Sequence, residues 1–396
     1  MQHLKRKQCI TTQTGPFGYF LFHSRIRRLF QVLVFFPFLA QISAFAAQTE
    51  YQSPVMVPIP HPMTSLLRVK EVRQELGISA DQINDVEEVI GEVDLPLWRL
   101  RDLPVQQRNE AAGLLIQQLK QNLSEILSQR QMERLNQLTR QAVGIAAVLG
   151  PDVTLKLNLS GEQIENIRIS LSTSYDKLAA LQKNTEIRSE SRKAAYLRKL
   201  RDEAEKNIFA VLTGYQQRTL RKLMGRPFDL SKVRIVACKA PEFKVSTWIN
   251  PPETALPEPA GKVTVIHFYA FGCGNCIRTL QYYNEWRKHF SPSAFQIIGI
   301  HRPETERERD IDKVKEKAVE AGMEYPIAID NESLMWEAWA NHIWPSIYLL
   351  DRNGYVRYWW YGELNWQGAE SEKYLQGKIQ ELIDEEFVIE STDSAS

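Results

Sequence analysis

Cysteine is scarce in this chain of 396 residues, which contains only four. Cys9 lies near the N-terminus, and Cys238, Cys273 and Cys276 follow much later. So few cysteines, with an odd number after Cys9, exclude a scaffold held together by a network of disulfides. The length also exceeds that of one ordinary domain, so we expect two or three folded units.

The sequence also lacks a strong excess of either charge. Its formal net charge is +1, although residues 1–46 carry six basic side chains and no acidic one. Without those six, 43 of the 49 basic side chains remain against 48 acidic ones, a balance of about −5. Such a body has no electrostatic attraction for a phosphate backbone, so we expect no nucleic-acid partner.

No apolar run is long and pure enough for a typical transmembrane helix, which needs ~20 mostly apolar residues. The best candidate, LFQVLVFFPFLAQISAFAA (29–47), is interrupted by two glutamines, a proline and a serine. It follows three arginines and ends in AFA, a pattern typical of a signal-peptide cleavage site. We therefore expect residues 1–46 to be a signal peptide, and the protein to be exported to the periplasm or cell envelope. An uncleaved single membrane anchor is the alternative.

Proline is rare between residues 63 and 226, where apolar residues recur at helical intervals. From Ile164 to Leu178, for example, every third or fourth residue is apolar or aromatic. This spacing places the apolar side chains on one face of a helix. The pattern predicts an all-α domain over residues 63–226.

A short phrase recurs four times in this segment: ISADQ (78–82), LSQRQ (127–131), LSGEQ (159–163) and LTGYQ (212–216). Each copy contains Ser or Thr followed three residues later by Gln, which is a helix capping box. Copies one and three are 81 residues apart, and copies two and four are 85 apart. This spacing predicts that the segment consists of two similar halves.

The repeated phrase resembles the LTxxQ repeats of small, all-helical periplasmic chaperones of the Spy type. This resemblance covers five residues in each copy. It implies a helical cradle that binds a partner or an unfolded chain. The alternative is that four good helix starts share one pattern and that the domain is a spacer or a dimerisation unit.

Residues 227–261 are rich in proline and predict an extended connector. Beyond it, strands and helices are predicted to alternate. VTVIHFYAF (263–271), AFQIIGIH (294–301) and YPIAID (325–330) are typical of buried strands, and residues 344–362 predict a hairpin. The resulting order, β-α-β-α-β-α-β-β-α, predicts an α/β domain with a mixed sheet flanked by helices.

Cys273 and Cys276 stand where the first of these strands meets the following helix. A Cys-x-x-Cys pair in that position of a βαβ unit indicates a thioredoxin-like redox motif. The N-terminus of a helix favours a thiolate, so Cys273 is the expected nucleophile. Cys276 lies one turn later, within reach of a mixed disulfide formed on Cys273.

Residues 240–388 resemble the thioredoxin-like domain of the TlpA/ResA group, most closely the branch at the C-terminus of DipZ-type cytochrome-biogenesis proteins. The motifs that carry the resemblance are GCGNCIRTL (272–280), GIHRPE (299–304), YPIAIDN (325–331), W-x-x-W (336–339) and NHIWPSIYLLDRNGYVRY (341–358).

This resemblance implies a thioredoxin fold, a reversible Cys273–Cys276 disulfide and no cofactor. Cys273 would attack and Cys276 would resolve the mixed disulfide. Pro345 falls at the cis-proline loop of the group, where a substrate chain would pair with the backbone, and Trp344 would line the same face.

The sequence departs from thioredoxin beside this motif. Gly272 stands where thioredoxins usually have Trp, and His267 replaces a buried Asp that helps proton transfer. We consider His267 and Glu304 candidates for proton transfer, since His titrates near neutral pH. The alternative for His267 is a buried core residue on a strand.

The same residues allow other interpretations. A structural zinc site needs four ligands, and one Cys-x-x-Cys with scattered histidines does not supply two paired motifs, so we expect no metal. A thiol peroxidase would use one activated thiol, whereas this chain has a pair. A non-catalytic or chaperone-like binding protein, with the helical half holding the client, is the main alternative. Cys238 reads as a buried residue, a regulatory partner or an intermolecular link.

The sequence thus predicts an extracytoplasmic thiol–disulfide oxidoreductase whose partners are protein thiols and disulfides. The direction of exchange stays open. A reductant in an oxidising compartment would require a membrane electron donor.

Overall fold

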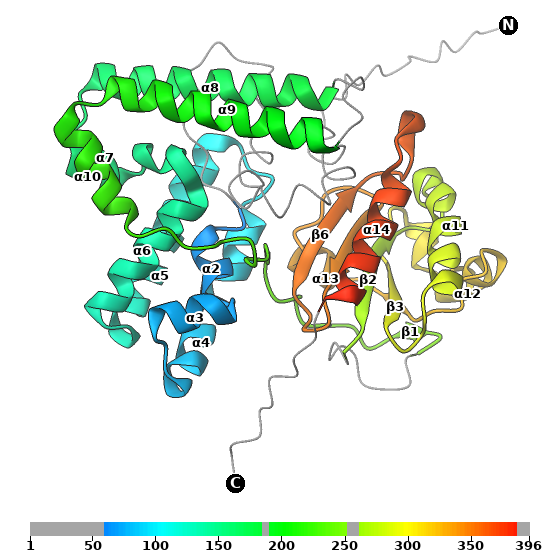
Figure 1. The fold of residues 1–396 in the computed structure, drawn as a ribbon. Coiled ribbons are helices and arrows are strands. Elements are labelled where there is room, and N and C mark those ends of the chain that lie inside the picture. The colour runs from blue at the N-terminus through cyan, green and yellow to red at the C-terminus, as the bar shows by residue number, and fades with distance from the viewer. Residues whose placement is uncertain (1–58, 184–189, 252–260, 386–396) are drawn as a thin grey trace, which may run out of the picture.

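The computed structural model describes residues 59–183, 190–251 and 261–385. The predicted signal peptide, residues 1–46, lies outside these ranges. Figure 1 shows helices alone in the first part of the chain and a sheet with flanking helices in the second. The predicted fold class, an all-α region followed by a thioredoxin-like α/β domain, is confirmed. The exact domain boundaries stay a prediction.

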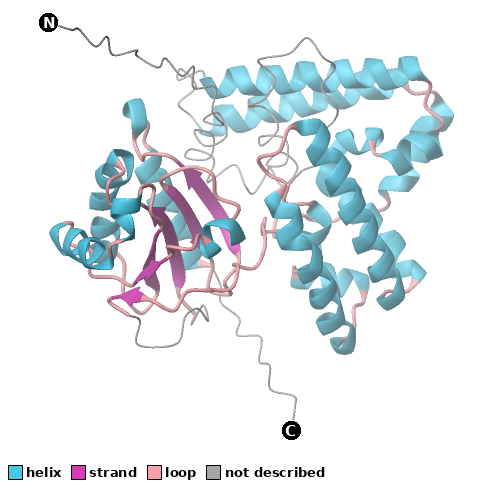
Figure 2. Cartoon of the chain, turned by 180° about the vertical axis from the view of Figure 1, so that it is seen from behind, coloured by secondary structure: helices cyan, strands magenta, loops and turns pink. Residues whose placement is uncertain are grey.

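The N-terminal region consists of helices joined by short turns (Figures 1 and 2). They are α2 (Pro62–Leu67), α3 (Lys70–Leu76), α4 (Ala80–Arg99), α5 (Val105–Ile126), α6 (Gln129–Val143), α7 (Pro151–Leu157), α8 (Gly161–Lys183), α9 (Glu190–Val211) and α10 (Gly214–Met224), with a 3-10 turn at Gly144–Leu149. Helices α4 and α5 form one antiparallel hairpin, and α8 and α9 form a second.

All four predicted capping boxes are present. The hydroxyls of Ser79, Ser128, Ser160 and Thr213 each accept a hydrogen bond from the backbone amide three residues later, and the side-chain oxygen of the Gln there accepts one from the backbone amide of the cap residue. The boxes begin α4, α6, α8 and α10. Local sequence therefore fixes where these four helices start.

The glutamines of the boxes also pair across the fold. Gln82 and Gln131 are hydrogen-bonded to each other in the first half, and Gln163 and Gln216 are hydrogen-bonded in the second. Each amide also donates to a carbonyl at the C-terminal end of the helix that precedes the partner's helix, as Gln82 does to Ile126 and Gln163 to Val211. The repeated phrase therefore joins the two ends of each hairpin as well as starting helices.

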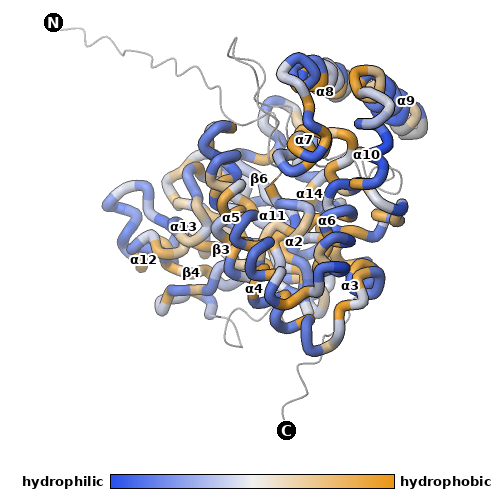
Figure 3. Tube along the Cα trace, turned by 90° about the vertical axis from the view of Figure 1, so that its left-hand side faces the viewer, coloured by the Kyte–Doolittle hydropathy of each residue, from blue (hydrophilic) through white to orange (hydrophobic). Residues whose placement is uncertain are grey.

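Each half buries its own apolar cluster. The first is formed by helices α2 to α6, and the second by helices α7 to α10 together with the 3-10 turn at Gly144–Leu149. Hydrophilic and hydrophobic residues both occur around α8 and α9 in Figure 3, as expected for amphipathic helices that bury one face. No helix among the described residues is long and apolar enough to cross a membrane.

The C-terminal region has a mixed sheet of strand order β1-β4-β3-β2-β5-β6. The strands are β1 (Trp248–Ile249), β2 (Val263–Tyr269), β3 (Phe295–His301), β4 (Ile327–Ile329), β5 (Ser346–Leu350) and β6 (Val356–Tyr361). Strands β2, β3 and β4 are parallel, while β5 and β6 form the predicted hairpin. The flanking helices are α11 (Gly274–His289), α12 (Ile311–Glu320), α13 (Leu334–Ala338) and α14 (Ser371–Asp384).

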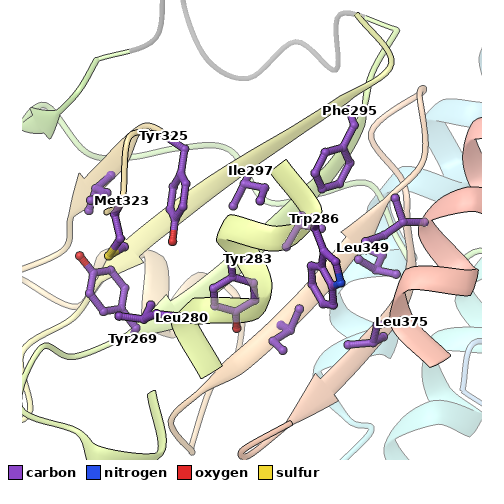
Figure 4. Close-up of a cluster of buried hydrophobic side chains, with 14 of the residues drawn as sticks. Tyr269, Leu280, Tyr283, Trp286, Phe295, Ile297, Met323, Tyr325, Leu349 and Leu375 are labelled. Atoms are coloured by element: carbon purple, nitrogen blue, oxygen red, sulfur yellow. The ribbon is translucent and has the colours of Figure 1, made fainter. Parts of the chain in front are cut away.

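Both faces of the sheet are buried. One face packs against α11, α12 and α14 through residues such as Tyr283, Trp286 and Leu375 (Figure 4). The opposite face packs against α13, against residues around Cys238, and against Trp98 of α4. Part of the Pro-rich segment predicted as a connector is thus packed into the protein, and Trp248–Ile249 adds strand β1 to the sheet edge.

Candidate functional site

The two cysteines lie at the start of α11, directly after β2, as the sequence predicts. Cys273 is the N-cap residue of α11 and is half-buried. Cys276 lies in the first turn and is buried. Both are free thiols in this structure. A helix N-terminus leaves backbone amides without intrahelical partners, so negative charge on Cys273 is stabilised there.

The two thiols differ strongly in acidity. A hydrogen bond with the Cys276 thiol, aided by the amides of Cys276 and Asn275, lowers the pKa of Cys273 to about 7 against the opposing effect of burial. Burial raises the pKa of Cys276 well above its ordinary value, and its bond to Cys273 raises it further. One thiol is therefore substantially ionised at neutral pH and accessible, while the other is a buried proton donor to it.

The Trp344–Pro345 peptide bond is cis. Ser346, the next residue, pairs with Phe268 in the ladder between β5 and β2. The register therefore brings Pro345 to the end of β2 from which the dithiol loop departs. The Pro345 carbonyl accepts a hydrogen bond of 2.7 Å from the amide of Gly362.

Trp344 is half-buried beside the same site. Its ring stacks on Trp336 with centroids 4.2 Å apart, and the guanidinium of Arg302 lies 4.9 Å from its ring centre. Trp344 and Cys273 both pack against the core that α11 covers. The structure thus brings together the four residues that the sequence assigned to the dithiol and the substrate loop.

The C-terminal region is similar in sequence to known proteins. Residues 236–359 match the model of the AhpC/TSA family. DipZ of Mycobacterium tuberculosis is 35% identical over 136 residues, which cover 33% of this chain and 20% of DipZ. The thiol-disulfide oxidoreductase YkuV of Bacillus subtilis is 26% identical over 138 residues, covering 35% of this chain and 88% of YkuV. The thiol-disulfide oxidoreductase ResA of Geobacillus thermodenitrificans is 26% identical over 122 residues, covering 31% and 67% respectively.

The C-terminal region is a thioredoxin-like domain of the TlpA/ResA type. Two of the relatives of this domain, YkuV and ResA, are thiol-disulfide oxidoreductases. They support the same class of redox enzyme for the domain. This chain spans only about a fifth of the length of the DipZ relatives that it matches.

His267 is fully buried in the core of the thioredoxin-like domain. Its ring stacks on Tyr283 at 4.2 Å and lies near Tyr269 and Tyr325. Burial lowers its pKa to about 3, so the ring is neutral, and neither ring nitrogen has a hydrogen-bond partner among the described residues. Within the part of the chain that the structure describes, no hydrogen bond joins His267 to either cysteine, and its environment is that of a buried core residue.

Glu304 is exposed and lies close enough to the dithiol for its negative charge to oppose ionisation of both Cys273 and Cys276. It belongs to the loop between β3 and α12. Of the two proton-transfer candidates, Glu304 is therefore the one that the fold brings into electrostatic contact with the thiols.

Sequence reasoning missed Glu308 in the same loop, although its side chain is only 3% exposed. One carboxylate oxygen accepts a 2.7 Å hydrogen bond from the amide of Gly272, and the other accepts from the amides of Glu304 and Thr305. Glu308 thus joins the loop before Cys273 to the loop that carries Glu304.

This carboxylate also explains why glycine precedes Cys273. A Cβ atom at Gly272 would lie 2.4 Å from a Glu308 oxygen, closer than any real contact of that kind. A Trp at this position, as in thioredoxin, would displace the carboxylate. The signal available in sequence was the departure at Gly272 itself, but its cause lies 36 residues away.

Phe271 is held in a similar way. Its amide donates to Nε2 of the buried His301, and the two rings stack with centroids 5.6 Å apart. Burial lowers the pKa of His301 to about 4, which keeps this nitrogen free to accept. The two residues before Cys273 are therefore held by side chains from the last residue of β3 and from the loop after it.

Cys238 lies in the core on the opposite face of the sheet, together with Trp98. Burial raises its pKa far above its ordinary range, so it is a poor nucleophile. Of the three readings of Cys238, this environment favours the buried core residue. Within the residues that the structure describes, no group of His, Cys, Asp and Glu is arranged to hold a metal ion.

Proposed function

We propose that this protein is an extracytoplasmic thiol–disulfide oxidoreductase that exchanges the Cys273–Cys276 pair with disulfides of other proteins. The observation that carries the proposal is the asymmetry of the two thiols. Cys273 is partly accessible and has a lowered pKa, while Cys276 is buried, protonated and hydrogen-bonded to it. This is the arrangement that thiol–disulfide exchange needs.

The reaction proceeds in two exchanges. The Cys273 thiolate attacks one sulfur of the substrate disulfide, forms a mixed disulfide and releases the other substrate sulfur as a thiolate. Cys276 then loses its proton and attacks the Cys273 sulfur, which releases the second substrate thiolate. The substrate gains two electrons, and the protein is left with a Cys273–Cys276 disulfide. Running the same steps backwards oxidises a dithiol substrate.

Glu304 is the group that we assign to accept the proton of Cys276. Its carboxylate is in contact with solvent and influences the acidity of both thiols. His267 is the weaker candidate, because its ring is neutral, buried and not bonded to the dithiol. Trp344 and Pro345 would form the surface against which the substrate chain is held.

Export rests on the sequence pattern of residues 1–46. In an oxidising compartment the disulfide form would accumulate, so a reductive role would need a membrane electron donor to return two electrons. We therefore propose such a donor as a second partner beside the protein substrates.

Reduction of insulin by dithiothreitol, with the mature chain as catalyst, tests the proposal. Cys273→Ser should abolish catalysis, and Cys276→Ser should accumulate a mixed disulfide through Cys273. Cys238→Ala is the control and should retain the wild-type rate. If Cys273→Ser were as fast as wild type, the proposal would be wrong. Consumption of hydrogen peroxide without insulin reduction would instead identify a thiol peroxidase.

A further inference from the structure

The turn between α4 and α5 of the helical region reaches into the thioredoxin-like domain. Trp98, at the end of α4, is fully buried. Its ring makes edge contacts with Trp339, Tyr348 and Trp359, at centroid distances of 6.0, 5.5 and 6.3 Å. The end of the α4–α5 hairpin is thus part of the core on one face of the sheet.

Arg101 follows Trp98 by one turn and is only 7% exposed. Its guanidinium lies 3.8 Å from the ring centre of Trp98 and donates to the hydroxyl of Tyr361 at 2.5 Å. It also donates to the carbonyls of Trp339 and Ala340, at 3.0 and 3.1 Å. A planar guanidinium can satisfy several fixed acceptors at once, which an ammonium group cannot do equally well.

A second arginine extends this contact. Arg99 donates to the carbonyl of Ala338 at 3.2 Å. Three successive carbonyls, from Ala338 to Ala340, are therefore bound by side chains of the helical region. Ala340 has a φ of 49°, a backbone conformation that residues other than glycine rarely adopt. Such a conformation persists where neighbouring contacts hold it.

These carbonyls begin the segment that leads to Trp344 and Pro345. Within it, Asn341 accepts a 2.5 Å hydrogen bond from the hydroxyl of Tyr348, and that hydroxyl lies 3.5 Å from Arg101. Nδ1 of His342 lies 3.7 Å from a carboxylate oxygen of Asp102. Contacts with the α4–α5 turn thus continue to within two residues of Trp344.

We propose that Arg101 is a positioning residue that holds the Trp344–Pro345 loop, so that the helical region sets how well the dithiol accepts protein disulfides. This inference rests on the proposed function. It concerns a residue that lies outside the residues matched by the family model, 236–359. A protein disulfide needs the loop to hold its chain, whereas a small disulfide needs only access to Cys273, so the two substrates should respond differently.

The test uses the full mature chain and compares kcat/KM for insulin with kcat/KM for a small aromatic disulfide. In Arg101→Lys the charge and the aliphatic stem remain, but the fork of hydrogen bonds is lost. The ratio of the two values should fall about tenfold, mainly through a higher KM for insulin, as expected for loss of a net hydrogen-bond contribution of this size. The pH profile of Cys273 alkylation should not move.

Arg140→Lys is the matched control. Arg140 is similarly buried, at 6% exposed, and donates to the carbonyl of Leu223 and to Asp152 within the helical region, away from the substrate loop. It should leave the ratio unchanged while causing a similar loss of thermal stability. Arg99→Ala is a second variant, at an exposed position, that tests the inference if Arg101→Lys does not fold. It should lower the ratio of the two kcat/KM values about twofold.

An unchanged ratio in both Arg101→Lys and Arg99→Ala would overturn the inference. An equal loss with both substrates would also overturn it, since that result indicates a purely structural role. If the wild-type chain reduced neither disulfide, the proposed function itself would fail.

Discussion

The two faces of the sheet are built from different parts of the chain. The face under α11 and α14 is packed by residues between Ile249 and Ile383, all from the C-terminal region. The opposite face is completed by Trp98 from α4, more than a hundred residues before the first strand. The face that supports the dithiol is therefore self-contained, whereas the other depends on the helical region. A domain of common type has thus been adapted so that the helices are part of its core.

The largest effect is expected from a substitution that removes the contribution of the helical region to this face of the sheet. Trp98→Ala would remove a fully buried ring that contacts three other aromatic residues. We expect the free energy of unfolding to fall by about 3–5 kcal/mol, as for other buried Trp to Ala changes. Urea denaturation followed by circular dichroism measures this. Trp366→Ala, at an exposed position, is the control and should change stability by less than about 0.5 kcal/mol. If Trp98→Ala lowered the free energy of unfolding by as little as Trp366→Ala, the face of the sheet that Trp98 covers would not depend on the helical region.

Glu308→Gln tests the contacts that hold the loop before Cys273, on the face of the sheet that supports the dithiol. The carboxylate accepts three backbone amides, and an amide group would present a donor to at least one of them. We expect a stability loss of about 1–3 kcal/mol, the cost of an unsatisfied buried group. The rate of insulin reduction should fall as well, because the loop before Cys273 is released.

Glu306→Gln is the control for this change, because Glu306 lies in the same loop and its side chain is 89% exposed. It should match wild type in both measurements. Equal behaviour of the two variants would mean that the buried carboxylate does not hold the loop.

Gly272→Ala probes the same contact from the other side. The added Cβ would lie 2.4 Å from the Glu308 oxygen, so the carboxylate must move. We expect a loss of about 1–3 kcal/mol, typical of overpacking. In Gly272→Ala combined with Glu308→Ala the two losses should be less than additive, because each removes the same interaction. Strict additivity in a double-mutant cycle would contradict the proposed link.

The smallest effect concerns the acidity of Cys273. Its folded-state pKa of about 7 lies below that of an ordinary thiol, so its rate of alkylation should be half-maximal near pH 7 and level off above it. Cys276→Ala removes the hydrogen bond that contributes most to this lowering. The midpoint should then move to higher pH, measured with iodoacetamide from pH 5 to 9. An unchanged midpoint would place the stabilisation in the helix amides alone.

Much of the fold could be predicted because its signals are local. The four capping boxes act over three residues, and all four start helices as expected. The alternation of buried strands and helices likewise predicted the order of β2 to α14. The short strand β1 was missed, because two residues within a proline-rich stretch carry no periodicity.

The dithiol could also be predicted, since its position at a strand–helix junction is a property of neighbouring residues. The residues that hold it could not. Glu308 contacts Gly272 across 36 residues, and a Glu in a highly charged loop resembles an ordinary surface residue. His267 shows the converse, because a titratable residue six positions before the motif is in fact enclosed by tyrosines.

The sequence by itself determined the helical first part, the mixed sheet and the place of Cys273 and Cys276, because periodicity, capping and strand composition act over a few residues. Only the tertiary structure decided what surrounds the dithiol. The chain had to fold before Glu308 could reach the Gly272 amide, and before Arg101 could bind carbonyls that lie 238 and 239 residues away. The sequence around Trp98 does not show which residues will bury it, because its neighbours in the core come from the distant C-terminal region.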